Sequence, residues 1–172
     1  MSEPKVEIRE AIPADALKLN KFTRTIFANS KHLITRENEY TMRPFKQRLW
    51  IAKKKANELE TCLVATRDNK IVGMIDNWTD RRHRVKHVTC FAMSVAEDYR
   101  GNGVGQSLLN TFIEWVKSNP TLQRIELHVH SDNKTAIKLY ERMGFEREGV
   151  RKQAIKYEDG RVVDDIIMAL WP

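Results

Sequence analysis

The chain has 172 residues, of which 41% are apolar and 31% are charged. This length suits one substantial core, and we expect residues 1–172 to form a single domain. The composition excludes an intrinsically disordered chain, and no apolar run approaches the roughly 18 residues that a membrane-spanning helix needs. The beginning of the chain shows no signal-peptide pattern, so we expect a cytoplasmic location and no membrane partner.

The net charge is +7, from 30 Lys and Arg against 23 Asp and Glu. A positive excess favours anionic partners, such as nucleic acid, an acidic protein or a polyphosphate cofactor. The basic residues are spread along the chain, with short clusters at residues 53–55 and 81–84. The sequence has neither a basic tail nor an aromatic-and-basic RNA-binding signature, so nucleic acid is not the expected partner.

Seven segments show the pattern of β-strands. Residues 6–11 and 125–130 alternate between apolar and polar residues, whereas residues 87–95 are almost continuously apolar, which is typical of a central strand covered on both faces. The Asp159-Gly160 pair between the last two segments is a strong hairpin signal. The expected strands cover residues 6–11, 61–66, 71–75, 87–95, 125–130, 151–157 and 162–170.

Four segments predict helices, which cover residues 13–29, 44–58, a stretch that ends before Pro120, and a stretch that begins near Asn133. Gly144 is well placed to cap the last of them. In the second helix, an apolar face is expected to hold Phe45, Leu49 and Ala52. The order of strands and helices predicts a mixed α/β domain of the α+β type with a largely antiparallel sheet.

The most informative motif is the loop Arg100-Gly101-Asn102-Gly103-Val104-Gly105, which follows the central strand and opens a helix. Glycines let the backbone approach a ligand closely, and the first amide groups of a helix form an anion site. Arg100 adds a fixed positive charge. The spacing fits neither a dinucleotide fingerprint, because Gln106 replaces the last glycine, nor a nucleotide P-loop. These residues predict a phosphate or pyrophosphate site, with a ligand-free turn as the alternative.

Two motifs resemble the cofactor-binding blocks of the GNAT superfamily of N-acetyltransferases. Arg100-x-x-Gly103-x-Gly105 is similar to its acetyl-CoA signature, and Asn133-x-x-Ala136-x-x-Leu139-Tyr140-x-x-x-Gly144-Phe145 is similar to its second block. The segment 148–165 resembles bacterial members related to ribosomal-protein N-terminal acetyltransferases. The resemblance implies a GNAT-like fold, with a mixed, mostly antiparallel sheet of about six to seven strands and helices on both faces. It also implies acetyl-CoA as co-substrate and no metal.

The resemblance further implies a set of residues for transfer of an acetyl group to an amine. Tyr140 would serve as general acid toward the departing thiolate, and the backbone N–H of Val95 would donate to the carbonyl oxygen. Judged without the resemblance, Tyr140 would be interpreted as a packed core tyrosine and Asn133 as a helix cap. The expected cofactor-binding residues are Met93, Ser94, Val95, Arg100, Gly101, Asn102, Gly103, Val104, Gly105, Gln106, Asn133, Ala136 and Tyr140.

The base that accepts the proton of the amine is left open by the sequence. A typical alkyl amine has a pKa of about 10.4, so only about one molecule in 2,500 is neutral at pH 7. Candidates for the base, acting directly or through water, are Asp76, Glu37, Glu39 and His87. Other residues with the right chemistry are expected to be structural: Cys62 and Cys90 as small buried side chains, and His83, His87, His128 and His130 as exposed histidines rather than metal ligands.

The acceptor is not encoded in any motif of the sequence. A small amine and a protein N-terminus both fit, and the pocket is expected from residues 31–43, residues 76–86 and the final hairpin. A catalytically silent acyl-CoA-binding sensor and, less favoured, a basic nucleic-acid-binding module are the alternatives to an enzyme. A homodimer is common among the proteins that the chain resembles, but the sequence leaves the oligomeric state open.

Overall fold

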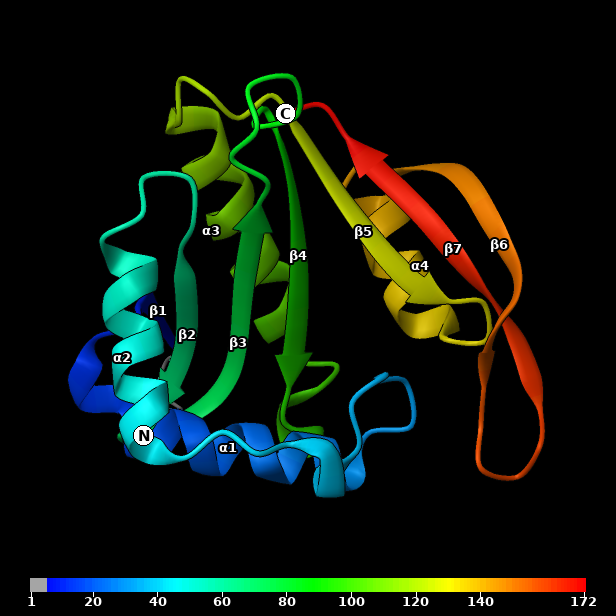
Figure 1. Ribbon diagram of the computed structural model, residues 1–172. Helices are drawn as coiled ribbons and strands as arrows, with labels where there is room; N and C mark the ends of the chain where they lie inside the picture. The colour runs from blue at the N-terminus through cyan, green and yellow to red at the C-terminus, as the bar shows by residue number, and fades with distance from the viewer. Residues whose placement is uncertain (1–5) are drawn as a thin grey trace.

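The computed structural model describes residues 6–172 and contains one seven-stranded sheet, shown in Figure 1. The interpretation that no signal peptide begins the chain concerns residues 1–5, which lie outside the described residues. The strands follow the spatial order β1-β2-β3-β4-β5-β7-β6, and β4–β5 is the one parallel pair among the described residues. This arrangement confirms the predicted mixed, mostly antiparallel sheet. The strands are β1 (Glu7–Glu10), β2 (Cys62–Arg67), β3 (Lys70–Thr79), β4 (Val88–Val95), β5 (Arg124–His130), β6 (Glu146–Lys156) and β7 (Val162–Leu170).

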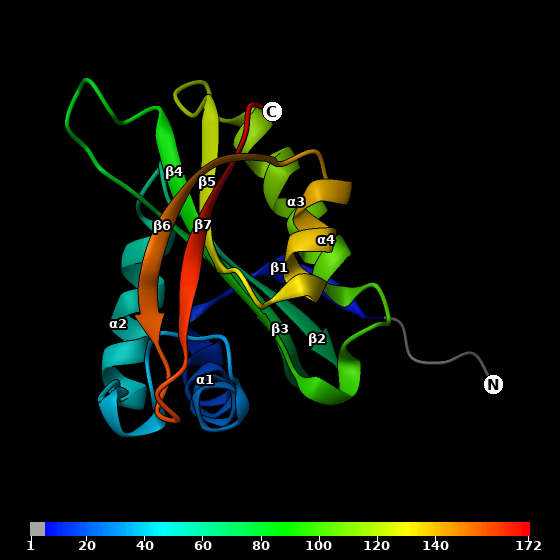
Figure 2. The same ribbon diagram turned by 90° about the vertical axis from the view of Figure 1, so that its right-hand side faces the viewer.

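Helices cover both faces of the sheet, as predicted. In Figure 2 the sheet is seen nearly edge-on, with α1 and α2 on one side and α3 and α4 on the other. Each side has its own buried apolar cluster: α1 and α2 pack with residues of β2 and with Ile71 of β3, whereas α3 and α4 pack with residues of β2, β3, β4, β5 and β7. The helices are α1 (Ala16–Asn29), α2 (Pro44–Lys55), α3 (Val104–Ser118) and α4 (Lys134–Arg142).

Local side-chain contacts fix where the helices begin and end. The Asp15 carboxylate accepts from the Ile12 amide at 2.9 Å and pairs with both terminal nitrogens of Arg9, which holds the turn Pro13–Asp15 before α1. The Asn133 side chain accepts from the Ala136 amide at 3.2 Å and begins α4. Gly144, with a φ of 91°, ends that helix in the left-handed conformation that favours glycine.

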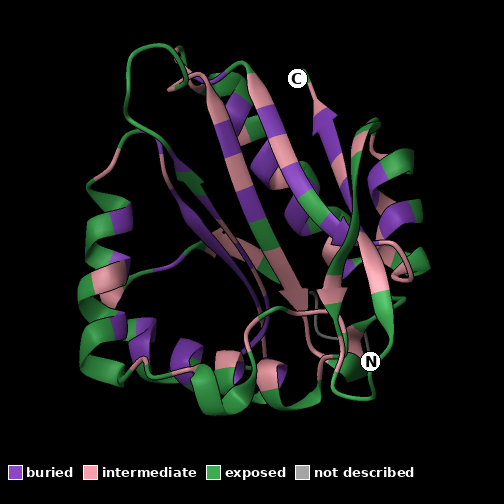
Figure 3. Cartoon of the chain, turned by 45° about the vertical axis from the view of Figure 1, so that its right-hand side comes forward, coloured by how far each residue is buried: buried purple, intermediate pink, exposed green. Residues whose placement is uncertain are grey.

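The predicted apolar face of α2 is wrong. Phe45 and Leu49 are 72% and 56% exposed, and Ala52 is also exposed. The helix instead buries Ile51 together with two polar residues, Gln47 and Lys54. Burial of these polar groups is tolerated because Gln47 Oε1 accepts from the Tyr40 hydroxyl at 2.9 Å and Lys54 pairs with carboxylates. The helix also ends at Lys55 rather than near residue 58. Figure 3 shows the general pattern of burial, with exposed residues along much of the outer surface of the helices and buried residues interspersed among them.

Two strands are longer than predicted, for reasons that the polarity pattern hides. β3 continues to Thr79 because the Asn77 and Thr79 side chains, although polar, are buried and hydrogen-bonded to Thr89 at 2.8 and 2.9 Å. β6 begins at Glu146 rather than residue 151, with mostly exposed side chains at the sheet edge. The hairpin turns themselves are where they were predicted, with Asp68 and Asn69 both in the left-handed region at φ of 49° and 61°.

Candidate active site

The centre of the sheet contains a place where two neighbouring strands separate. β4 and β5 pair only at their beginnings, through Val88 with Arg124, Thr89 with Ile125 and Cys90 with Glu126. Beyond these pairs the two strands diverge, as Figure 1 shows. The second half of β4, from Phe91 to Val95, therefore has a strand partner on its β3 side and none on its β5 side among the described residues.

The backbone of Val95 faces this separation between β4 and β5. The Ala96 amide donates to Val72 of β3 at 2.9 Å, so the neighbouring Val95 N–H and C=O point away from β3. The Val95 carbonyl accepts from Arg100 Nε at 3.0 Å, which ties the glycine loop to the end of β4. By the same alternation the backbone of Met93 also faces the separation, whereas the Ser94 amide faces β3.

The glycine loop leads directly into α3. Gly101 and Gly103 both have a φ of 77°, and no atom lies within 4 Å of a Cβ built at either position. The positive φ, rather than crowding, is thus what requires glycine here. Gly103 is the N-cap, so the amides of Val104, Gly105 and Gln106 in the first turn have no helical acceptor. Together with exposed Arg100 they form a site suited to an anion.

Tyr140 lies under the separation on the α3–α4 side of the sheet. Its ring is in contact with Phe91 of β4 and with Phe145, at centroid distances of 5.9 and 5.8 Å. Burial raises the pKa of the hydroxyl to about 12, and within residues 6–172 the hydroxyl has no hydrogen-bond partner. Thr61 Oγ1, and not the Tyr140 hydroxyl, is the fully buried side-chain polar atom without a partner in residues 6–172, so the Tyr140 hydroxyl keeps access to a ligand atom.

The opposite face of the sheet contains a pocket of about 240 Å³ between α1, α2, β3 and β4. Its lining is mostly apolar and includes Phe22, Ile26, Leu33, Met42, Trp50 and Met74. Asp76 of β3 is the single charged side chain in the lining, and Ser94 and Ala92 of β4 close the side toward the separation. The pocket and the glycine loop therefore approach the end of β4 from opposite faces.

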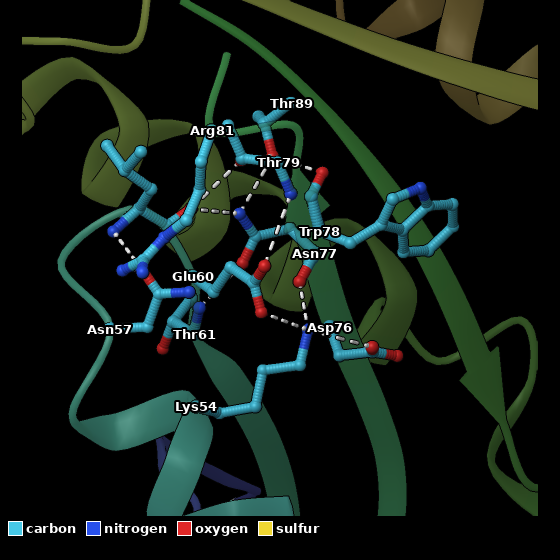
Figure 4. Close-up of polar contacts among 11 residues, drawn as sticks. Lys54, Asn57, Glu60, Thr61, Asp76, Asn77, Trp78, Thr79, Arg81 and Thr89 are labelled. Atoms are coloured by element: carbon cyan, nitrogen blue, oxygen red, sulfur yellow. Dashed lines mark hydrogen bonds and ion pairs between the residues drawn. The ribbon is translucent and has the colours of Figure 1, made fainter. Parts of the chain in front are cut away.

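Asp76 belongs to the polar network drawn in Figure 4. The Lys54 ammonium lies 3.6 Å from Asp76 and 3.0 Å from Glu60, and it also donates to the Asn77 carbonyl. Burial raises the pKa of Asp76 to about 6, although Lys54 opposes part of the shift. The carboxyl group therefore titrates just below neutral pH, which is the range required of a general base.

The other three candidate bases do not reach the pocket lining. Glu37 and Glu39 are exposed in the short turn Glu37–Glu39, and the Glu39 carboxylate is occupied with the Arg36 amide at 2.8 Å. His87 precedes β4 at the end opposite Val95, where its carbonyl accepts from Gln123. Of the four predicted candidates, Asp76 alone lines the pocket.

Sequence reasoning missed a histidine–aspartate pair on the pocket side of the sheet. His128 Nδ1 lies 2.8 Å from the buried Asp165 carboxylate. On β5, His128 points to the same face of the sheet as Glu126, because the two residues are two positions apart. The Glu126 carboxylate lies 3.9 Å from Cys90 Sγ of β4, on the pocket face. His128 therefore lies on the pocket face too, across the separation between β4 and β5. A signal was available in the sequence. The period of two along each predicted strand places His128 and Asp165 at positions whose side chains can point to the same face of the sheet.

Two further expectations on histidine and cysteine need correction. His130 is not exposed but 5% accessible, because its Nδ1 is hydrogen-bonded at 2.9 Å to the hydroxyl of Tyr157. Cys62 is buried as predicted, whereas Cys90 is only half-buried. Burial and the adjacent Glu126 raise the Cys90 pKa to about 11, which disfavours a thiolate nucleophile. Within residues 6–172, no group of three His, Cys, Asp or Glu side chains is arranged to hold a metal ion.

The loop after α1 bridges the pocket and the final hairpin. Arg36 forms an ion pair with Glu158 at the tip of the β6–β7 hairpin, and His32 Nε2 lies 3.6 Å from Asp132. The same loop contributes Leu33, Tyr40 and Met42 to the pocket. Of the segments expected to form an acceptor pocket, residues 31–43 contribute three side chains to this pocket and residues 76–86 contribute Asp76, whereas the final hairpin contacts only the loop.

Comparison with known proteins identifies the family of this fold and site. Residues 25–145 match the acetyltransferase (GNAT) family, and the chain belongs to that family. It is 27% identical in sequence to the acetyltransferase of GNAT family from Streptococcus pneumoniae, with a TM-score of 0.95 over 98% of this chain and 100% of that chain. The predicted family and GNAT-like fold are thereby confirmed.

Two curated relatives from Escherichia coli (strain K12) are similar over part of their length. The first, L-amino acid N-acetyltransferase AaaT, is 37% identical over 62% of this chain and 65% of its own. The second, [Ribosomal protein bS18]-alanine N-acetyltransferase, is 37% identical over 48% of this chain and 54% of its own. The chain thus matches less than two thirds of either relative. None of the helices described in residues 6–172 is both long and apolar enough to span a membrane.

Proposed function

We propose that this chain transfers the acetyl group of acetyl-CoA to a primary amine by direct attack of the amine. The observation that carries the proposal is the position of the Val95 amide. Its N–H points into the separation between β4 and β5, with the glycine loop on one side and the pocket lined by Asp76 on the other. A donor placed there would stabilise the negative charge that develops on a carbonyl oxygen during acyl transfer.

The residues of the glycine loop and of α4 would hold acetyl-CoA, the donor of the acetyl group. The free amides at the start of α3, with Arg100, suit the pyrophosphate of CoA, and the Tyr140 hydroxyl suits its sulfur. In the reaction, the amine nitrogen forms a bond to the acetyl carbon while the carbon–sulfur bond breaks. The thiolate that leaves receives a hydrogen bond and finally a proton from Tyr140. Asn133 caps α4 and would position Tyr140 rather than contact the reacting atoms.

Asp76 is our choice for the group that holds the acceptor ammonium and takes its proton. It is the charged residue of the pocket lining, and with a pKa of about 6 it is mostly ionised at pH 7. His128, oriented by Asp165, is the second base on the same face and would pass the proton toward solvent. Cytoplasmic location and a homodimer remain expectations.

The two alternatives to an enzyme are less well supported. A silent acyl-CoA sensor would have no need for a buried Asp76 in a pocket on the acceptor side. A nucleic-acid-binding module would need a basic surface, yet many Arg side chains are already paired, such as Arg124 with Glu126 and Glu148. A thermal melt distinguishes an acetyl-CoA-binding protein from a nucleic-acid-binding module. Acetyl-CoA should raise the Tm of the former, and RNA at moderate salt should raise the Tm of the latter.

The direct test of the proposal uses two variants of Val95. Val95→Pro removes an N–H that β3 does not use, whereas Val95→Ala keeps it. Loss of one such donor lowers kcat by about 100-fold to 1,000-fold in acyl-transfer enzymes, and we expect this from Val95→Pro alone. The assay follows free CoA thiol and the mass of the acetylated amine. Equal activity of the two variants would contradict the assignment, and no transfer to any amine by the native chain would contradict the function.

A further inference from the structure

The acceptor pocket combines one carboxylate with a mostly apolar wall. Its volume of about 240 Å³ far exceeds the roughly 15 Å³ that one water molecule requires, so it has room for a side chain of several heavy atoms. The apolar side chains of the wall come from several separate segments, which include Phe22 and Ile26 of α1, Leu33 and Met42 of the following loop, Trp50 of α2 and Met74 of β3. Among the polar side chains of the lining, the Thr23 hydroxyl donates to the Leu19 carbonyl and the Tyr40 hydroxyl donates to Gln47, so both are already hydrogen-bonded within the protein. Such a mostly apolar wall favours an apolar occupant.

The charge of the lining restricts the occupant further. Asp76 can pair with an ammonium group, and neither Lys nor Arg is part of the lining. Lys54, the nearest cation to Asp76, is buried and already shared between Asp76, Glu60 and the Asn77 carbonyl. A carboxylate attached beside the reacting amine would therefore lie close to Asp76 with no cation in the lining to pair with it.

We infer that the acceptor is a primary amine that carries one bulky apolar side chain and no free carboxylate next to the amine. This inference rests on the proposed acetyl transfer and names its substrate class. The ammonium pairs with Asp76, and the side chain lies against Leu33, Met42 and Met74. An aryl- or alkylamine and the N-terminus of a peptide whose first residue is apolar share this chemistry.

The experiment compares matched amines at fixed acetyl-CoA concentration, with kcat/KM measured by thiol release. We expect phenethylamine, L-phenylalaninamide and a C-terminally amidated peptide that begins with phenylalanine to exceed glycinamide and spermidine by about tenfold or more, because burial of a large apolar side chain contributes at least this much. L-Phenylalaninamide should also exceed free L-phenylalanine by tenfold. A higher kcat/KM for the small amines than for the peptide identifies a small-molecule acceptor. A higher kcat/KM for the peptide identifies a protein N-terminus.

Two adjacent loop residues provide a matched pair of variants. Leu33 lines the pocket, whereas Ile34 is 76% exposed and lies outside the lining. Leu33→Glu should lower kcat/KM for L-phenylalaninamide at least tenfold while the KM for acetyl-CoA and the Tm stay unchanged. Ile34→Glu should leave both kinetic values within twofold and the Tm within about 2 °C.

The outcomes separate the two proposals. Preference for spermidine, for glycinamide or for free L-phenylalanine over its amide would overturn the inferred acceptor class while leaving acetyl transfer intact. Equal effects of Leu33→Glu and Ile34→Glu would also overturn it. If acetyl-CoA neither stabilises the chain nor acetylates any of these amines, the proposed function itself fails.

Discussion

The role of the Tyr140 hydroxyl leads to a quantitative prediction for Tyr140→Phe. With a pKa of about 12, this hydroxyl is a weaker acid than a typical thiol, whose pKa is about 8.5. Full transfer of its proton to a thiolate is therefore uphill by about 5 kcal/mol, as each pKa unit corresponds to about 1.4 kcal/mol. We conclude that Tyr140 first stabilises the thiolate as a hydrogen-bond donor and gives up its proton only late.

A hydrogen bond to a charged group contributes about 1.5–3 kcal/mol, so Tyr140→Phe should lower kcat by about 10-fold to 100-fold. The aromatic contacts with Phe91 and Phe145 are kept in the variant, and the lost hydroxyl has no partner within the described residues. The Tm should therefore stay within about 2 °C, since the change in stability is expected to be below about 0.5 kcal/mol.

The assay is steady-state thiol release with acetyl-CoA and a reactive amine, together with a thermal melt. The native chain should also show no loss of activity from ionisation of Tyr140 up to about pH 10, two units below the pKa of about 12. Turnover of Tyr140→Phe within about twofold of the native value would refute the assigned role. A large drop in Tm would instead mean that the hydroxyl is structural.

Further predictions concern the base, the glycine loop and α2. Because the pKa of Asp76 is raised to about 6, kcat/KM should fall as pH drops through 6, and Asp76→Asn should abolish this limb. Lys54→Met removes a charge that lowers the pKa of Asp76, so a pH–rate profile should show the limb moved upward by about one unit or more. Gly103→Ala should raise the KM for acetyl-CoA and cost about 1–2 kcal/mol in a denaturant melt, because φ is 77°. Ile51→Ala should cost about 2–5 kcal/mol, and Phe45→Ser less than about 0.5 kcal/mol in the same melt.

The parts of the fold that sequence reasoning predicted correctly are those set by local chemistry. The positive φ of Gly101 and Gly103, the cap at Asn133 and the Asp159-Gly160 turn each follow from the residue at that position. The alternation of Ile125, Leu127 and Val129 likewise fixes one face of β5. These features required no knowledge of distant contacts.

The errors occur where a polar residue is buried by a partner far along the chain. Lys54, a member of the basic cluster at residues 53–55, is buried because it pairs with Glu60 and Asp76, which lie in other segments. His130 was expected to be exposed because Tyr157 is 27 residues away. Hydrophobic periodicity treats any buried polar group as exposed, so it assigned the wrong face to α2.

The acetyl-CoA side of the proposed site depends on local sequence, whereas the acceptor side depends on contacts between distant segments. The proposed acetyl-CoA site is drawn from two short contiguous motifs, around Gly103 and around Tyr140, each recognisable by itself. The pocket combines α1, α2, the loop after α1 and two strands, and its charged residue, Asp76, lies 43 positions after Leu33. Substitutions in the loop after α1 can therefore change which amine is accepted while the donor motifs stay intact. Selection for a new acceptor would act on contacts such as Leu33 and Met42, where the sequence has no motif.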